Sequence, residues 1–201
     1  MYVVEHSDPE AFSARSHPWR GSASDPSHRY HDLKKRPELI RTSLEDLQPF
    51  SRQPAVETFY QLLEWLNGSS SILETNDCAF SGPDTNEMAG FAKALQCSGR
   101  VMLLFRDLPQ NTDDAKVHGL TEAIARALSL EDEGYEWGVI GATIVPVRFT
   151  TLPGTEGDQR GTQLMLSFWA WGDDERETMA NLDRTLTNLS SVLRGVSVQH
   201  P

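Results

Sequence analysis

The chain has 201 residues, and its 18 Lys and Arg against 29 Asp and Glu give a formal net charge of −11. Hydrophobic residues make up 38% of it, enough for one folded core. The acidity argues against nucleic-acid binding through bulk charge. The longest mainly apolar stretch, residues 137–147, is far shorter than the roughly 20 residues of a membrane helix. We therefore expect neither nucleic acid nor a membrane among the partners.

The N-terminus and the cysteines bear on the compartment. The first six residues contain no basic segment followed by an apolar core, which a secretory signal would have. Cys78 and Cys97 are too few for a disulfide scaffold. We therefore expect a reduced, cytoplasmic protein.

The charge divides the chain near residue 53. Residues 1–53 carry eight basic and eight acidic side chains, whereas residues 54–201 carry 10 and 21. The first part also contains five prolines and four of the six histidines, a composition that permits turns and short helical pieces only. The sequence therefore predicts an N-terminal arm, residues 1–53, packed on a single acidic domain, residues 54–201.

Hydrophobic periodicity predicts the elements of this domain in chain order. They are a helix over 54–66, a strand over 71–80, a helix over 85–95, a strand over 100–107, a helix over 113–130, strands over 137–150 and 162–171, and a helix over 173–194. The order α-β-α-β-α-β-β-α predicts an α+β fold, with an antiparallel or mixed sheet of about four strands and helices packed on one face. Pro146 places its strand at an edge or at a bulge.

The last strand predicts a binding surface. Its alternation sends Leu164, Leu166 and Phe168 to one face, and Met165, Trp169 and Trp171 to the other. Arg148 and Arg106 fall on this second face if the polar sides of the strands coincide. Tryptophan, arginine and methionine are enriched at protein interfaces. The alternatives are that the arm covers this face as a second core, or that a small-molecule pocket lies between face and arm.

The element order, size and acidity resemble the class I type III secretion chaperones, which are dimeric α+β proteins that hold an extended effector segment on apolar patches. The charge is also similar to that of acidic toxin-immunity proteins. No motif carries either resemblance, and the 53-residue arm departs from the chaperone pattern. Both imply a protein that binds a partner or a second copy of itself.

One run of residues suggests catalysis. Cys78 follows Asp77 and lies near Glu74, and a thiol in such a place acts as a nucleophile if a histidine lowers its pKa. That histidine would be His118 or one from the arm. The simpler interpretation of Cys78 is a small buried hydrophobic residue. No nucleotide-binding or zinc-peptidase motif is present, so we expect no cofactor.

The arm histidines suggest a metal site. His28 and His31 have a spacing compatible with zinc and would need Asp32, with His17 or His6, to complete a ligand set. The simpler interpretation is surface histidines in a turn-rich arm, and we predict no metal. The function we expect is binding of a protein partner or self-association through the sheet face. The alternative is an enzyme or a small-molecule-binding protein with its pocket between that face and the arm.

Overall fold

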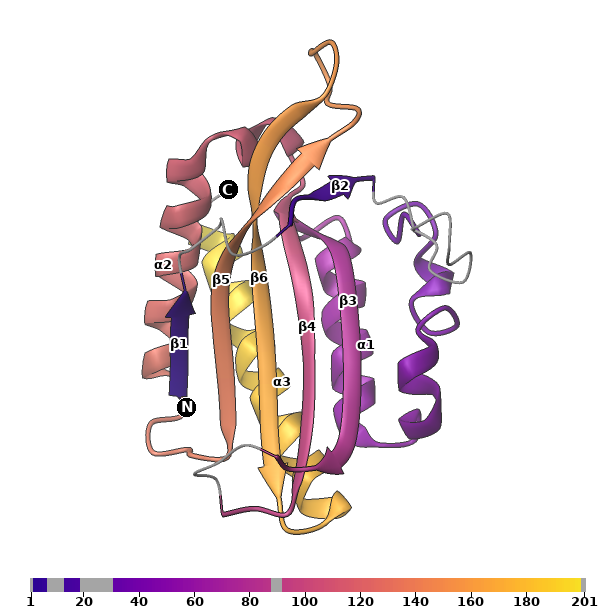
Figure 1. Ribbon diagram of the computed structural model, residues 1–201, viewed down its shortest axis with the longest axis vertical. Coiled ribbons are helices and arrows are strands. Elements are labelled where there is room, and N and C mark those ends of the chain that lie inside the picture. Colours follow the sequence, from indigo (N-terminus) through magenta and orange to yellow (C-terminus); the bar gives the residue numbers. More distant parts are fainter. Residues whose placement is uncertain (1, 7–12, 19–30, 88–91, 200–201) are drawn as a thin grey trace.

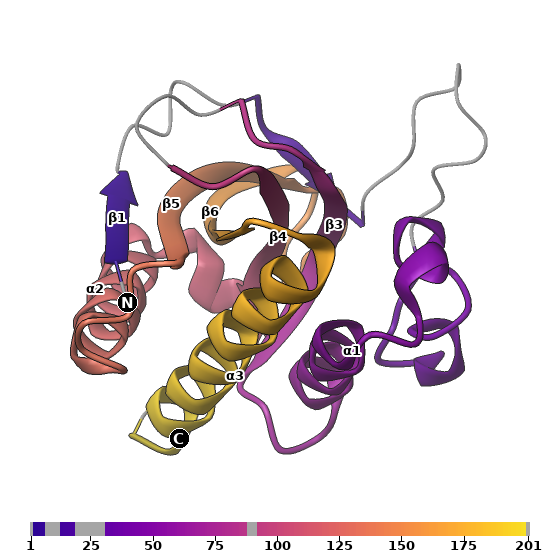
Figure 2. The same ribbon diagram turned by 90° about the horizontal axis from the view of Figure 1, so that it is seen from below.

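The computed structural model describes residues 2–6, 13–18, 31–87 and 92–199. In chain order its strands and α-helices are β1 (Tyr2–His6), β2 (Arg15–His17), α1 (Pro54–Asn67), β3 (Leu73–Thr85), β4 (Leu95–Phe105), α2 (Asp114–Leu130), β5 (Gly138–Phe149), β6 (Gln159–Gly172) and α3 (Glu175–Gln199). The strands form one mixed sheet in the order β1-β5-β6-β4-β3, with β2 also on β5. The three helices lie on one face of this sheet (Figures 1 and 2). The α+β class and the mixed sheet are thus confirmed.

The predicted number of strands is wrong because the arm adds two. β1 pairs in parallel with residues 139–143 of β5, and β2 pairs in parallel with residues 147–149 of the same strand. Both lie on the same side of β5, since β6 occupies the other side. Pro146 falls between the two paired stretches, where a residue without an N–H is tolerated. Strands of five and three residues complete an existing edge and show too little alternation to be recognised in the sequence.

The predicted helix over residues 85–95 is also wrong. β3 continues to Thr85 and β4 starts at Leu95, and these two residues pair across an antiparallel ladder. β3 therefore continues through Gly82 and Pro83, a pair of residues that commonly marks a turn. A register shift between Ser81 and Asp84 absorbs them, and Gly82 has a φ of +104° that favours glycine. The order of the body is accordingly α1-β3-β4-α2-β5-β6-α3.

The main core lies between the sheet and the helices. Phe168 of β6 is fully buried, and its ring meets that of Phe59 of α1 edge to face at a centroid distance of 5.4 Å. Leu33, Ile40 and Leu47 of the arm join the same core. Residues 31–53 therefore bury apolar side chains against the body, with short 3-10 helices at Pro37–Leu39 and Glu45–Phe50.

The ends of the helices explain several of the acidic residues. Asp113 accepts a hydrogen bond from the Ala115 amide at 3.1 Å at the start of α2. At the start of α3, the Asp174 carboxylate accepts one from the Glu177 amide at 2.8 Å. Carboxylates at these positions satisfy amides that have no partner within the helix. Over the described part of the chain, no helix combines the length and apolarity that crossing a bilayer would require.

Candidate functional site

We call the side of the sheet that the helices leave uncovered the open face; β2 closes one end of it. The His17 Nδ1 of β2 donates to Asn76 Oδ1 of β3 at 2.8 Å, although β2 is paired with β5. Arg15 Nη1 likewise lies 2.8 Å from Asp77 Oδ2 of β3. Two strands, β6 and β4, separate β5 from β3, so the sheet must curl for these contacts to form (Figure 2). The curl encloses a second, smaller core made of Leu104, Val147, Phe149 and Leu152.

A buried polar cluster lies beneath β2. Glu74, only 1% exposed, forms an ion pair with Lys34 through Oε2, and its Oε1 lies 4.0 Å from His17 Nε2. Asn76 Nδ2 donates to Gln163 Oε1 at 2.9 Å. Within the described residues, Glu74 Oε1 and Gln163 Nε2 are buried without a hydrogen-bond partner. Buried polar atoms of this kind are rare and costly, so the cluster is a candidate site. His17 and Lys34 also line a neighbouring cavity of about 530 Å³.

A second cavity, of about 620 Å³, opens on the open face next to β2. We call it the arginine pocket. Of the described residues that line it, three are arginines and none is acidic: Ser13, Ala14, Arg15, Ser16, Arg100, Met102, Val145, Arg148, Met165 and Ser167. The register of β4 and β6 places Met102 opposite Met165, and Arg100 opposite Ser167. The pocket thus has a methionine floor with guanidinium groups around it.

Asp77 holds two of these arginines in place. Its Oδ2 accepts from Arg100 Nη2 at 3.1 Å and forms the ion pair with Arg15. One carboxylate oxygen therefore serves two guanidinium groups. Arg148 has a longer contact, 3.6 Å from Asp158, and both of these side chains are 56% exposed. An exposed ion pair of this kind is weak, so Arg148 can exchange Asp158 for another anion.

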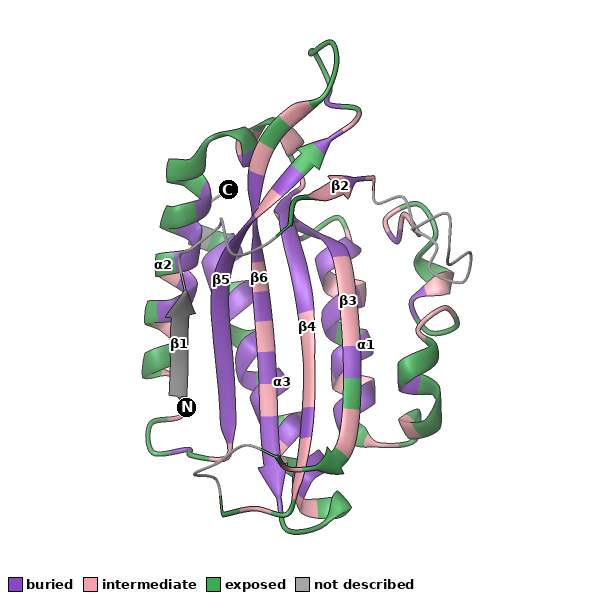
Figure 3. Ribbon diagram, viewed as in Figure 1, coloured by how far each residue is buried: buried purple, intermediate pink, exposed green. Residues whose placement is uncertain are grey.

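The structure brings only part of the predicted surface together. Met165 and Arg148 line the arginine pocket, and Trp169 follows Ser167 on the same face of β6. Trp169 is half-buried and lies over Gly141, where an added Cβ would come within 3.1 Å of its ring. Trp171 is only 1% exposed and donates from Nε1 to Gln96 Oε1 at 3.0 Å, which leaves it little surface for a partner. In Figure 3, β6 alternates between buried and half-buried residues along this stretch.

Arg106 lies away from the arginine pocket. Its guanidinium donates to the main-chain carbonyls of Ser71 at 3.0 Å, Leu66 at 3.1 Å and Gly68 at 2.6 Å. These carbonyls belong to the end of α1 and to the loop before β3, where helical carbonyls lack partners of their own. Arg106 therefore stabilises this connection.

The candidate nucleophile faces the core. Cys78 packs against the main hydrophobic cluster, and burial, with a smaller contribution from Asp77, raises the pKa of its thiol to about 12. His118 lies on the exposed side of α2, where Nδ1 donates to the Asp114 carbonyl at 2.8 Å. No hydrogen bond joins His118 to Cys78 in the described part of the structure. A thiol in this state stays protonated near neutral pH.

The metal hypothesis falls partly outside the described residues. His28 and His6 cannot be placed as side chains, because the former is not described and only the backbone of the latter is. His31 is half-buried, and Asp32 forms an ion pair with Lys35 at 3.0 Å. In the ranges that the structure describes, no three His, Cys, Asp or Glu side chains gather as metal ligands would.

Arg100, Arg15 and Lys34 are site residues that the sequence reasoning missed. Arg100 is the charged residue at the start of the strand predicted over 100–107, two residues before Met102. The alternation that assigns Met102 to a face therefore assigns Arg100 to the same face. Arg15 and Lys34 offer no such signal, since the arm has no periodicity and their partners Asp77 and Glu74 are far away in the chain.

Comparisons with known proteins give no further guide to the site. No family model, curated protein or solved structure matches the chain.

Proposed function

We propose that the protein is a binding protein that holds an extended, acidic segment of a protein partner on its open face. The observation that carries this proposal is the arginine pocket, which is lined by Arg15, Arg100 and Arg148 although the body of the chain is strongly acidic. Only 10 basic residues lie in positions 54–201, and two of them line this one cavity. Arginines placed together in this way favour carboxylates, which they bind in a bidentate manner.

The methionine floor of the arginine pocket favours a peptide ligand over a small inorganic anion. Met102 is buried and Met165 is half-buried, and methionine side chains adapt to differently shaped apolar groups. Trp169 extends the same face along β6 beyond Ser167. A segment with alternating acidic and apolar side chains would contact the arginines and the methionine floor together.

Synthetic peptides test the proposal directly. The probes are two fluorescein-labelled peptides of about a dozen residues with the same leucines, one carrying glutamates and the other lysines at the remaining positions. We expect the acidic peptide to bind, to be released by salt, and to lose about tenfold in affinity with Arg100→Gln. Arg126→Gln on the exposed side of α2 is the matched control. Equal binding of both peptides, or equal losses in the two variants, would overturn the proposal.

Asp77→Asn provides an opposite test. This change removes the carboxylate that engages both Arg15 and Arg100. We expect the acidic peptide to bind about threefold or more tightly, because less competition for the guanidinium groups remains. Weaker binding would contradict this competition and show that the peptide needs the arginines in the positions in which Asp77 holds them.

A second candidate function, small-molecule binding between sheet and arm, is favoured by the two unpartnered polar atoms of the buried cluster. His17 and Lys34 line the adjacent cavity of about 530 Å³, so a ligand there would reach the cluster. Native mass spectrometry of the protein as purified should then reveal a stoichiometric small-molecule adduct that His17→Ala removes. A wild-type protein without an adduct, or an adduct retained in His17→Ala, would count against this candidate.

A further inference from the structure

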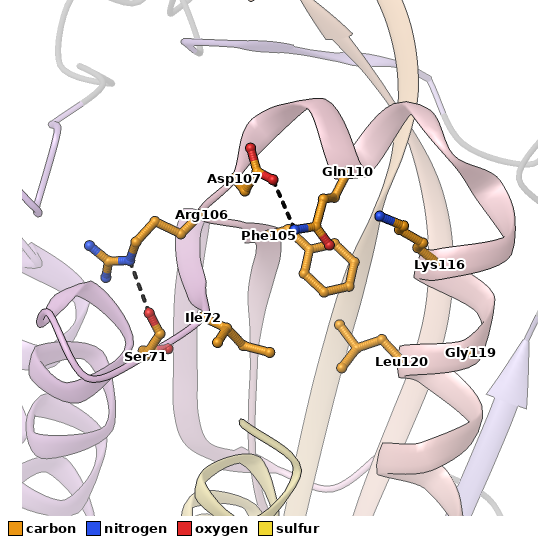
Figure 4. Close-up of a pocket in the computed structure, with 9 residues that line it drawn as sticks. All are labelled: Ser71, Ile72, Phe105, Arg106, Asp107, Gln110, Lys116, Gly119 and Leu120. Atoms are coloured by element: carbon orange, nitrogen blue, oxygen red, sulfur yellow. Dashed lines mark hydrogen bonds between the residues drawn. The ribbon is translucent and has the colours of Figure 1, made fainter. Parts of the chain in front are cut away.

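The largest cavity among those described lies on the side of the sheet that the helices cover. Its volume is about 800 Å³, and it is lined by the end of the α1–β3 loop, the end of β4 with the residues that follow it, and the first half of α2 (Figure 4). Pockets that hold small organic ligands have volumes of roughly 300–1,000 Å³. We call it the helix-side pocket; it is separate from the arginine pocket, with which it shares no lining residue.

The interior of the helix-side pocket is apolar. Ile72 directly precedes β3, Phe105 ends β4 and Leu120 lies in α2, and their side chains face one another across the cavity in Figure 4. Phe105 and Leu120 belong to the main core, and Ile72 packs against it. An apolar tail placed here would extend the core and exclude water from these three side chains.

One positive charge at the rim is available to a ligand. Lys116 is exposed and forms no ion pair within the described residues. The Arg106 guanidinium is already engaged by the carbonyls of the α1–β3 connection. Asp107 accepts a hydrogen bond from Gln110 Nε2 at 2.9 Å, so it too has a partner. Lys116 is therefore the group that would bind an anion.

Gly119 lines the helix-side pocket. It lies in the interior of α2, where glycine costs roughly 1 kcal/mol relative to alanine. No atom lies within 4 Å of a Cβ added at this position, so close packing does not require the glycine. Lys116, Gly119 and Leu120 are three and four residues apart and share one face of the helix. A side chain at position 119 would add atoms at the wall of the pocket, beside Lys116 and Leu120.

We propose that the helix-side pocket binds a small organic anion with an apolar tail, of the class of medium-chain carboxylates. The tail packs among Ile72, Phe105 and Leu120, and the carboxylate pairs with Lys116. The site is independent of the open face, because neither the residues nor the charges of the arginine pocket take part.

Competition with a fluorescent probe tests this site. The probe is anilinonaphthalene sulfonate, whose emission rises in an apolar environment, and the competitors are decanoate and decanol. We expect decanoate to displace the probe at one site per chain. Lys116→Gln should lower the affinity for decanoate about tenfold and leave the affinity for decanol unchanged. Equal displacement by decanoate and decanol in the wild type would overturn the assignment of an anion.

A volume-filling variant tests the location. Gly119→Leu should abolish decanoate binding and stabilise α2, because leucine is a far better helix former than glycine. Gly119→Ala should retain most of the binding, and Ser129→Leu on the exposed side of α2 is the control for an added leucine. Decanoate binding retained in Gly119→Leu, or absent from the wild type, would refute the proposal. Acidic-peptide binding by the same variants reports separately on the open face.

Discussion

The two faces of the same sheet are filled with different chemistry, and β6 shows the contrast within a few residues. Leu164, Leu166 and Phe168 are at most 1% exposed beneath the helices, whereas Met165 and Trp169 on the open face remain half-buried. Each of the three helices covers one face with an apolar stripe of its own. Among the described residues, the open face receives the short strand β2, and the charged groups of Glu74 and Lys34 are buried near its smaller apolar core.

This contrast decides what each face tolerates. A close-packed apolar layer is sensitive to volume, because its atoms have no free space into which to move. A buried charge is sensitive to its partner, because an unpaired ion in a poorly solvated site is costly. Away from the helix-side pocket, the helix-covered face should therefore respond to a single added methyl group, and the open face should respond to a single lost charge.

Lys34→Met is the largest test of the open face. The methionine keeps most of the apolar stem but leaves the Glu74 carboxylate, 1% exposed, without its lysine. Removing one partner of a fully buried ion pair typically costs about 3–5 kcal/mol. Because the Lys34 side chain is 27% exposed, we expect the free energy of unfolding to fall by an amount toward the lower end of this range, measured by urea unfolding followed by circular dichroism. Lys35→Met is the matched control, because Lys35 is 82% exposed in its pair with Asp32.

The same residues allow a rescue. In Lys34→Met/Glu74→Leu both charges are gone, and we expect most of the lost stability to return, as it does when apolar groups replace a buried pair. If Lys34→Met cost no more than Lys35→Met, the buried pair would not determine the stability of this face. If the double variant were no more stable than Lys34→Met, packing rather than the unpaired charge would explain the loss.

Gly99→Ala is the corresponding test of the helix-covered face. An added Cβ at position 99 would lie 2.3 Å from Phe168 Cζ and 2.7 Å from the Ala79 carbonyl oxygen. Phe168 is held against Phe59, so we expect overpacking to cost about 1–3 kcal/mol in the same unfolding experiment. Ser98→Ala, one residue away on the open face, should change stability little. Equal stability of the two variants would contradict the volume argument.

The contrast also explains which features the sequence could predict. The alternation of β6 and the apolar stripes of α1, α2 and α3 arise from contiguous residues, so the helix-covered face is largely predictable. His17 and Glu74 come together only because the sheet curls and β2 joins β5, and no local pattern encodes that contact. The turn-like residues Gly82 and Pro83 likewise obscured a continuous strand, since a register shift of the β3–β4 pair accommodates them.

The exposed ion pair between Arg184 and Asp132 belongs to neither face. We expect its loss to have the smallest effect on stability, against which the buried pair can be compared. Arg184 of α3 donates to Asp132, and this bond, followed by that from Asn188, lowers the pKa of Asp132 from 3.8 to about 2. A carboxylate with a lowered folded-state pKa stabilises the fold above the unfolded value, and this contribution disappears as pH falls from about 4 to about 2. Asp132 has a φ of 55°, which asparagine also tolerates, so Asp132→Asn isolates the charge.

We expect Asp132→Asn to lower the Tm at pH 7 by no more than about 2 °C, because solvent screens the pair. In thermal melts between pH 7 and pH 2, the Tm values of the two proteins should converge, since the wild-type carboxylate becomes increasingly protonated toward the acid end and loses most of its advantage. A difference that persisted unchanged to pH 2 would assign the effect to the amide rather than to the charge. The contrast between the faces depends on buried ion pairs contributing more than exposed ones. If Asp132→Asn lowered the Tm at pH 7 as much as Lys34→Met does, this distinction would be lost.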